Sequence, residues 1–528
     1  MSDFDILIRN GTVLDGGGGP ALRADVLIKG DRIADIGALG MASARQTVDA
    51  AGKVVAPGFV DIHTHSDMQS LTTPLAESKV MAGVTTELLG SCGDSPFPLR
   101  GAARESRTTI YDKGLYRMDW EDVEGYIARA EESGYSINRA LQVGHNTVRA
   151  AVMGFRRDEP SPEELKRMVD EIRLALEHGV FGFSTGLLYP PGCFCRTEEM
   201  IQLCRPVAEA GALYTTHIRS EGDRLEDAIN EQLRIARETG VRTQISHLKV
   251  SRKRNWHKID WLEETMHRAA DVERLDVAAD RYPYTAGSTG LDSVLPAWTY
   301  EGGTEREVKL LQDPESRARI AREVEHDYPT DESWQEAVVS YVRRAENKHL
   351  EGLNMLEISR KMGRKPMDAA FDLLIAEQAQ VSAIFHWMSE DNLRRILSWP
   401  FVMIGSDSGV RSVAPATREG KPHPRGFGTS PRVLGRYCRE LKLLTLPEAV
   451  RKLTGQTAER IGLPQRGLLR KGYFADITIF DPAVVIDRAT FEDPYQYPLG
   501  IATVIVNGVV AVRDGQHTGA KAGRILRR

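Results

Sequence analysis

The sequence of 528 residues contains only five cysteines, too few to cross-link so long a chain as a disulfide framework. It contains no apolar run near the ~20 residues that a membrane-spanning helix needs. Basic residues form no long run and the formal net charge is −5, which argues against a nucleic-acid-binding surface. The first residues lack the basic and then apolar segments of a signal peptide. We therefore expect a cytoplasmic protein that binds neither nucleic acid nor membrane.

Both ends of the chain contain short runs of β-branched and other apolar residues that are typical of strands. These runs are residues 4–8, 24–28, 32–36, 475–480, 503–506 and 509–512. The dipeptide Asn-Gly occurs at 10–11 and again at 507–508, and it is typical of hairpin turns. We expect residues 1–57 and 466–528 to form one small β-sandwich to which both chain ends contribute.

The central part of the chain alternates predicted helices and strands. Residues 161–164, Ser-Pro-Glu-Glu, form a capping box with proline at the first helical position, and an apolar stripe follows until Gly179. A strand is predicted directly afterwards at 180–185, and another at 243–247 after the next helix. Repeated βα units are typical of a parallel sheet closed into a barrel. We therefore expect a TIM (β/α)8 barrel over residues 58–465.

One connection in this barrel is much longer than the others. Tyr282 and Asp407 both lie at predicted strand ends, yet they are 125 residues apart, which is too long for a single βα unit. We expect an inserted subdomain at about residues 292–380. The predicted fold class is therefore α/β, a TIM barrel with a small β-sandwich built from both chain ends and an inserted subdomain.

A His-x-His pair ends the predicted first strand of the barrel. Side chains alternate along a strand, so His63 and His65 should point to the same side, about 7 Å apart along the chain. Neutral imidazoles placed in this way can share a divalent cation. A lone pair fits equally well one core histidine and one surface histidine, so the interpretation depends on residues further along the chain.

Four more residues with suitable side chains end other predicted strands: Cys92, His217, His247 and Asp407. The carboxyl ends of the strands of a TIM barrel meet at one face, which carries the active site. One thiolate and two imidazoles suit zinc, with the fourth position open for water. Each residue alone also fits a structural role, such as a core cysteine or a capping aspartate. Together, in this order, they favour a metal site.

Several longer motifs accompany these residues. They are Gly-Phe-Val-Asp-x-His-x-His at 58–65, Gly-Val-Thr-Thr at 83–86, Ser-Thr-Gly-Leu-Leu-Tyr-Pro-Pro at 184–191, Tyr-Pro-Tyr at 282–284, Gly-Ser-Asp at 405–407 and His-Pro-Arg at 423–425. With these motifs the chain resembles the amidohydrolase superfamily, and within it the D-aminoacylases (N-acyl-D-amino-acid deacylases), over nearly its whole length.

The resemblance implies a particular metal centre. Cys92, His217 and His247 would hold one zinc ion tightly, and His63 and His65 would line a second, weaker site. Many binuclear relatives bridge their metals with a carboxylated lysine on strand 4, and the corresponding strand here offers no lysine. Asp407 would take a proton from the attacking water and return it to the leaving nitrogen.

The resemblance also implies a substrate, an N-acyl-D-amino acid whose amide bond is hydrolysed to a free D-amino acid and a carboxylic acid. Arg425, Tyr282 and Ser288 would bind its α-carboxylate, since a guanidinium fits a carboxylate in bidentate fashion. Lys249 lies on the same face as His247 and is a further candidate. Two alternatives stay open: hydrolysis of another amide, such as a cyclic ureide or a D-amino-acid-containing metabolite, and a non-catalytic scaffold of the same fold.

A Cys-x-Cys pair, Cys193 and Cys195, lies in a predicted loop. Such a pair could bind a metal or act as a redox pair. Two cysteines do not complete a metal site, so we interpret the pair as an incidental loop feature.

Overall fold

The computed structural model describes residues 3–111 and 116–528. Its centre is an eight-stranded sheet in which every pair of neighbouring strands is parallel. The strands, in chain order, are β6 (Phe59–Asp61), β7 (Val84–Leu89), β8 (Asn138–Gly144), β9 (Gly182–Gly186), β10 (Leu213–His217), β11 (Arg242–Ile245), β12 (Val277–Arg281) and β16 (Val402–Ile404). The sheet is that of a TIM barrel, as predicted.

The first and last strands approach each other just beyond their ends. Thr64 and Ser408 form an isolated parallel bridge, and the Asp407 N–H donates a 2.8 Å hydrogen bond to the His63 carbonyl oxygen. Gly405 allows this approach, because a Cβ there would lie 2.7 Å from the Cβ of His63. These contacts bring the ends of β6 and β16 together and nearly close the barrel.

Apolar side chains of the strands fill the barrel interior. They form one buried cluster that includes Val60, Leu88, Ala140, Leu213, Ala278 and Met403. Helices cover the outside, among them α6 (Pro162–Glu177), α7 (Thr197–Glu209) and α8 (Leu225–Thr239). The capping box predicted at Ser161 is present, because its side chain accepts from the Glu164 N–H and the Glu164 side chain accepts from the Ser161 N–H. The barrel interior is thus filled with side chains, and an active site in such a barrel lies at the rim where the strands end.

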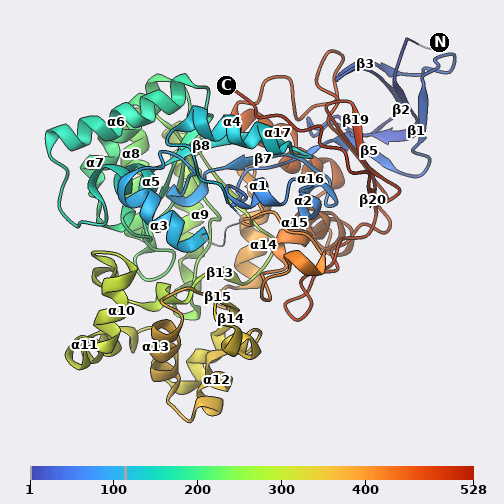
Figure 1. The fold of residues 1–528 in the computed structure, drawn as a ribbon. Helices are drawn as coiled ribbons and strands as arrows, with labels where there is room; N and C mark the ends of the chain where they lie inside the picture. Colours follow the sequence, from blue (N-terminus) through green and yellow to red (C-terminus); the bar gives the residue numbers. More distant parts are fainter. Residues whose placement is uncertain (1–2, 112–115) are drawn as a thin grey trace.

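The two chain ends form a nine-stranded sheet at one side of the barrel, where the first and last segments of the chain lie side by side in Figure 1. Its strands are β1 (Ile6–Val13), β2 (Leu22–Lys29), β3 (Arg32–Gly37), β4 (Gln46–Asp49), β5 (Val54–Pro57), β17 (Ile477–Phe480), β18 (Ile501–Val506), β19 (Val509–Arg513) and β20 (Gln516–His517). Strand β17 pairs with β5, so this structure depends on both ends, as predicted.

The two Asn-Gly dipeptides have different outcomes. Asn507 and Gly508 form the predicted hairpin turn between β18 and β19, both with positive φ. The turn predicted at Asn10 is wrong, because Asn10 lies inside β1. There Arg9 and Asn10 stand opposite one residue of β2, which makes a β-bulge. The left-handed φ of 62° at Asn10 thus serves a bulge instead of a chain reversal.

The long connection between β12 and β16 folds as a separate layer. Strands β13 (Gly287–Gly290), β15 (Val381–Phe385) and β14 (Ala337–Val342) form an antiparallel sheet. Helices α10 (Thr304–Gln312), α11 (Pro314–Val324), α12 (Met355–Met362) and α13 (Pro366–Ala376) pack with it around a core of their own. The sheet begins at 287 and ends at 385, just outside the predicted segment 292–380. Figure 1 shows these helices as a lobe below the barrel.

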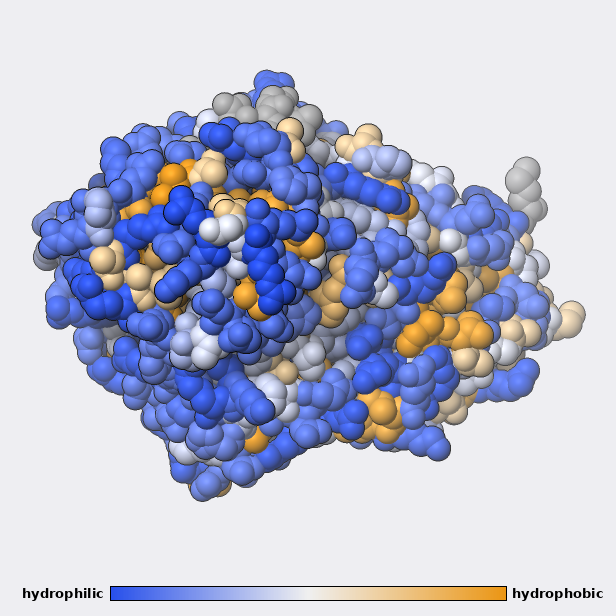
Figure 2. All heavy atoms as spheres, turned by 90° about the horizontal axis from the view of Figure 1, so that it is seen from below, coloured by the Kyte–Doolittle hydropathy of each residue, from blue (hydrophilic) through white to orange (hydrophobic). Residues whose placement is uncertain are grey.

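The surface on the side of this lobe is mostly hydrophilic, with small and separated apolar patches (Figure 2). None of the helices in the described part of the chain has both the length and the apolar character needed to cross a bilayer.

Candidate metal centre and active site

The candidate ligands lie where the strands of the barrel end. His63 and His65 follow β6, Cys92 follows β7, His217 ends β10 and His247 follows β11. Asp407 follows β16. All of these side chains except that of His63 line a single cavity of about 1260 Å³, whose wall includes residues of the barrel loops and of the inserted lobe.

Cys92 lies at the centre of the cluster. Its Sγ is 3.3 Å from His63 Nε2, 3.7 Å from His217 Nδ1 and 3.6 Å from His247 Nε2. Ligand atoms around a tetrahedral zinc ion, at bond lengths of about 2.0–2.3 Å, stand roughly 3.5 Å apart. His217 Nδ1 and His247 Nε2 are closer, at 2.9 Å. The donor set and its spacing therefore fit zinc.

The electrostatics of the cluster favour the ligand form of the thiol. Burial alone would raise the pKa of Cys92, but the imidazoles of His63, His217 and His247 hold that pKa well below its ordinary value. A thiolate, not a thiol, binds metal. Cys92 is thus poised to act as a ligand.

The backbone is strained at three positions of the site. Cys92, His247 and Asp407 have φ values of 53°, 38° and 52°, in the left-handed region that non-glycine residues rarely adopt. Such a conformation costs of the order of 1–3 kcal/mol and persists where the surrounding structure imposes it, commonly at functional sites. In each case the left-handed residue lies two or three residues beyond the end of a barrel strand.

His63 links Cys92 to a second group of potential ligands. His63 Nε2 is 3.4 Å from Asp407 Oδ1, and His65 Nε2 is 3.0 Å from the same oxygen. On its other side, His63 Nδ1 is 3.1 Å from Asp280 Oδ1. Asp280 also accepts a 2.9 Å hydrogen bond from the His247 N–H, so one carboxylate positions both histidines. Sequence reasoning missed Asp280, although it directly follows the apolar run Val277–Ala279 of a barrel strand.

Glu221 is a second residue that sequence reasoning missed. Its Oε1 is 3.0 Å from His247 Nδ1 and 3.8 Å from His217 Nε2. Burial alone would raise the pKa of Glu221, but Lys249 and the two imidazoles hold it well below its ordinary value. The four-residue spacing from His217 to Glu221 was the available signal.

Lys249 lies in the wall of the cavity, beside these groups. Its ammonium group donates to Glu221 and lies 2.8 Å from His247 Nδ1. The ammonium group therefore contacts His247 of the metal cluster and its neighbour Glu221. The role of Lys249 as a further candidate for binding the substrate carboxylate stays a prediction.

Asp407 faces a cation as well as the imidazoles. Its Oδ2 is 2.8 Å from Arg425 Nη1. Burial alone would raise the pKa of Asp407, but Arg425 and His63 lower it well below its ordinary value. The carboxylate is therefore ionised and able to accept a proton.

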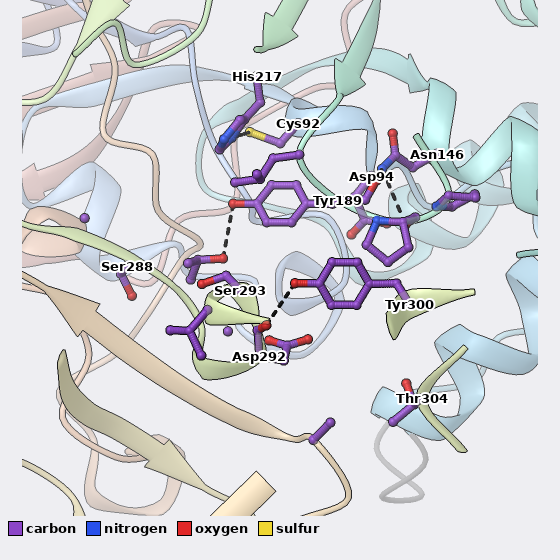
Figure 3. Close-up of a pocket in the computed structure, with 18 of the residues that line it drawn as sticks. Cys92, Asp94, Asn146, Tyr189, His217, Ser288, Asp292, Ser293, Tyr300 and Thr304 are labelled. Carbon is purple, nitrogen blue, oxygen red and sulfur yellow. Dashed lines mark hydrogen bonds between the residues drawn. The ribbon is translucent and has the colours of Figure 1, made fainter. Parts of the chain in front are cut away.

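The other residues predicted to bind substrate surround Arg425. Arg425 Nη2 donates a 3.4 Å hydrogen bond to the Ser288 carbonyl oxygen, and the guanidinium carbon lies 4.7 Å from the centre of the Tyr282 ring. Ser288 belongs to β13 of the inserted lobe, so barrel and lobe meet at this point. Figure 3 shows Ser288 in the wall of the same pocket as Cys92 and His217, with the Tyr189 ring between Cys92 and Asp292.

The Cys-x-Cys pair lies outside the metal cluster. Arg219 donates hydrogen bonds to the carbonyl oxygens of Cys193 and Cys195, at 3.2 and 2.6 Å. Burial raises the pKa of both thiols to about 12, so both are protonated at neutral pH.

Known proteins with similar sequences and structures were found. A model described as the amidohydrolase family matches residues 46–512. A D-aminoacylase of Alcaligenes xylosoxydans xylosoxydans is 38% identical over 527 residues, which cover 99% of this chain and 98% of that protein. An N-acyl-D-glutamate deacylase of Bordetella bronchiseptica, solved with zinc and a phosphonate mimic of the tetrahedral intermediate, is 34% identical. Its TM-score is 0.83, with 100% of both chains covered. A D-aminoacylase structure described for its binuclear metal centre has a TM-score of 0.84 and 37% identity, covering 99% of this chain and 100% of that one.

Proposed function

The chain belongs to the amidohydrolase family, and on that premise we propose that it hydrolyses the amide bond of N-acyl-D-amino acids. The products are a free D-amino acid and a carboxylic acid. One observation carries this proposal: a thiolate–imidazole cluster, an ionised carboxylate and a buried guanidinium border the same cavity. The similarity to a D-aminoacylase and to an N-acyl-D-glutamate deacylase supports the substrate class.

Cys92, His217 and His247 would hold one zinc ion tightly. His63 and His65 would line the second, weaker site. When bound, zinc lowers the pKa of a water towards ~7 and polarises the carbonyl group of the amide. Asp280 would orient His63 through its Nδ1 and His247 through its backbone N–H. Glu221 would orient His247 through its Nδ1.

Asp407 carries the proton transfers. Its Oδ1 faces the imidazoles, while its Oδ2 faces Arg425. Oδ1 is therefore the atom that takes the proton of the attacking water. Asp407 then returns this proton to the amide nitrogen, because an amine leaves only once it is protonated.

Arg425, Tyr282 and Ser288 would bind the α-carboxylate of the substrate. They fix one substituent of the α-carbon while the scissile carbonyl lies at the metal cluster. With the amide nitrogen and the carboxylate fixed, the two enantiomers direct their side chains to different sides of the α-carbon. A cavity with space on only one of these sides then accepts only one enantiomer. Lys249 is a further candidate for this contact, although Glu221 and His247 already engage its ammonium group.

All five cysteines are free of disulfide bonds in the structure. Free thiols suit a reducing compartment, and we propose the cytoplasm.

The test is hydrolysis of N-acetyl-D- and N-acetyl-L-amino acids by the zinc-loaded protein, with hydantoin as a cyclic ureide. We expect turnover of the D forms and a clear preference over the L forms. Preference for L forms would contradict the proposed stereochemistry. Turnover of hydantoin alone would favour the cyclic ureide, and loss of all turnover would favour the scaffold.

A further inference from the structure

Two carboxyl groups lie in the wall of the same cavity, on the side of the inserted lobe. Asp292 lies in the turn Leu291–Val294, directly after β13, and Glu307 lies in α10. Both line the cavity that contains Cys92 and Asp407. Figure 3 shows Asp292 on the opposite side of the Tyr189 ring from Cys92 and His217.

Glu307 is buried, and one of its carboxyl oxygens lacks a partner. The residue is only 4% exposed, and the Glu307 Oε1 atom has no hydrogen-bond partner among the described residues. Burial, with the nearby charge of Asp292 as the second cause, raises the pKa of Glu307 to about 9. Burial also raises the pKa of Asp292, to about 6. Backbone N–H groups of Asp292 and Ser293 partly offset the shift of the Asp292 pKa, and no cation of the described part of the chain lowers the pKa of either carboxyl group.

Several cations that line the cavity are already in ion pairs with other carboxylates. These pairs are Arg107–Asp94, Arg219–Glu231, Lys249–Glu221, Arg252–Asp327, Arg254–Asp223 and Arg425–Asp407. Asp292 and Glu307 thus form a pair of carboxyl groups for which no ion pair with a described residue is present. At neutral pH Asp292 is mostly ionised, while Glu307 keeps its proton, because an ionised Glu307 would be buried without a cation. A cationic ligand paired with Asp292 would favour ionisation of Glu307 as well, with release of that proton.

The wall is continuous from the metal cluster to this pair. The Tyr189 ring contacts the His217 ring, with 4.8 Å between their centres, and its hydroxyl accepts a 3.1 Å hydrogen bond from Thr289 Oγ1. Thr289 follows Ser288, the residue at the proposed α-carboxylate site, and Asp292 lies four residues beyond Ser288 on the same segment. A group bound by Asp292 therefore extends from the α-carboxylate end of the substrate.

We propose that Asp292 and Glu307 bind the basic side chain of an N-acyl-D-amino acid, an ammonium or guanidinium group. This inference rests on the proposed function and names its substrate class. The side chain is favoured over the acyl group because side chain and α-carboxylate leave the same carbon atom. An acidic side chain would be repelled by the Asp292 carboxylate. The chain would thus differ in preference from the N-acyl-D-glutamate deacylase to which it is similar.

N-acetyl-D-lysine and N-acetyl-D-norleucine test the inference, since they differ only in the terminal ammonium group. We expect kcat/KM to be at least about tenfold higher for the lysine derivative, the usual scale of a hydrogen bond to a charged group. N-acetyl-D-glutamate should be the poorest of the three. Glu307→Gln and Asp292→Asn should each lower the lysine-to-norleucine ratio towards one. Because the ratio is taken within each variant, partial loss of folded protein does not affect it.

Glu315→Gln is the matched control, because Glu315 is an exposed glutamate of the same lobe, on α11. It should keep the ratio of the unmodified protein. A ratio at or below one in that protein, or an unchanged ratio in both pocket variants, would overturn the inference. So would a preference confined to a basic acyl group, measured with glycyl-D-methionine against N-acetyl-D-methionine.

Failure of the proposed function is separable from failure of this inference. If no N-acyl-D-amino acid is hydrolysed, calorimetry with free D-lysine and D-norleucine on the zinc-loaded protein still tests the pair. Tighter binding of D-lysine that is lost in Glu307→Gln would support the inference. Equal binding of the two amino acids would overturn it.

Discussion

Arg425 Nη1 lies 2.8 Å from Asp407 Oδ2, so the residue that we assign to the substrate carboxylate also contacts the residue that we assign to proton transfer. Both side chains are buried, at 5% and 8% exposure. The contact keeps Asp407 ionised and holds the guanidinium in place before a substrate arrives. Binding and proton transfer therefore share one ion pair.

This arrangement predicts the effect of Arg425→Lys. An ammonium keeps the positive charge but loses the bidentate fork, so KM for an N-acetyl-D-amino acid should rise by at least about tenfold. The charge beside Asp407 persists, so kcat should fall less than KM rises. Steady-state kinetics measure both constants, and metal analysis should find the zinc content unchanged. An unaltered KM would remove Arg425 from the substrate site.

Asp407→Asn should separate proton transfer from metal binding. The amide cannot accept the proton of the attacking water, so kcat should fall by at least ~10²-fold. Zinc bound through Cys92, His217 and His247 should be retained. Asp391→Asn, which removes an exposed carboxylate, is the control and should keep the normal rate. A near-normal rate in Asp407→Asn would exclude it as the acid–base group.

The sequence predicted the fold and most residues of the cluster for one physical reason. In a parallel barrel the carboxyl ends of all strands meet at one rim, so residues as far apart as Cys92 and Asp407 could be brought together from their strand-end positions alone. The Asn-Gly at 507–508 was correctly predicted as a turn. The identical dipeptide at Asn10 was not, because a left-handed residue suits a bulge as well as a turn and pairing with β2 decides between them.

Contacts that depend on side-chain direction could not be predicted. Asp280 and Glu221 gain their roles from the ring nitrogens that they face, which strand periodicity does not specify. The Arg425–Asp407 contact requires the intervening loop to fold back over the rim. Glu307 lies in a charged helical segment that suggests exposure, and only the packing of α10 on the lobe buries it.

Cys92→Ala should lose most of the tightly bound zinc. The thiolate is the common neighbour of His63, His217 and His247, so its removal leaves the cluster without its charged ligand. Elemental analysis after dialysis measures the zinc that remains. Cys204→Ala is the control, since Cys204 is a buried thiol in the apolar core around the barrel and should not affect zinc. Full zinc retention in Cys92→Ala would place the site elsewhere.

The two halves of the centre should respond differently to substitution. We expect His63→Asn to keep more activity than His217→Asn, because His63 belongs to the proposed weaker site. Both histidines are buried beside Cys92, so the pair of substitutions is matched in burial and chemistry. The measurement is kcat/KM with zinc present at a fixed concentration. Equal collapse of both variants would indicate that His63 is as necessary as His217, as in an obligatory binuclear centre.

Glu307→Gln should change how stability depends on pH. The pKa of Glu307 is raised from an ordinary value of 4.5 to about 9, with burial as the largest cause. Between these values the unfolded chain has released this proton while the folded chain retains it. The folded state then binds more protons, so its stability falls as pH rises through this range.

Glutamine does not titrate, so the variant should lack this decline. Relative to the unmodified protein, its free energy of unfolding should increase by about 4 kcal/mol between pH 5 and pH 8, because one pKa unit of difference is worth about 1.4 kcal/mol. Urea unfolding at both pH values measures the difference. Glu315→Gln, whose carboxylate is exposed, should follow the unmodified protein at each pH. Parallel behaviour of Glu307→Gln and the unmodified protein would show that Glu307 already has a partner in the folded state. The buried, unpartnered carboxyl group on which the basic-side-chain site depends would then be absent.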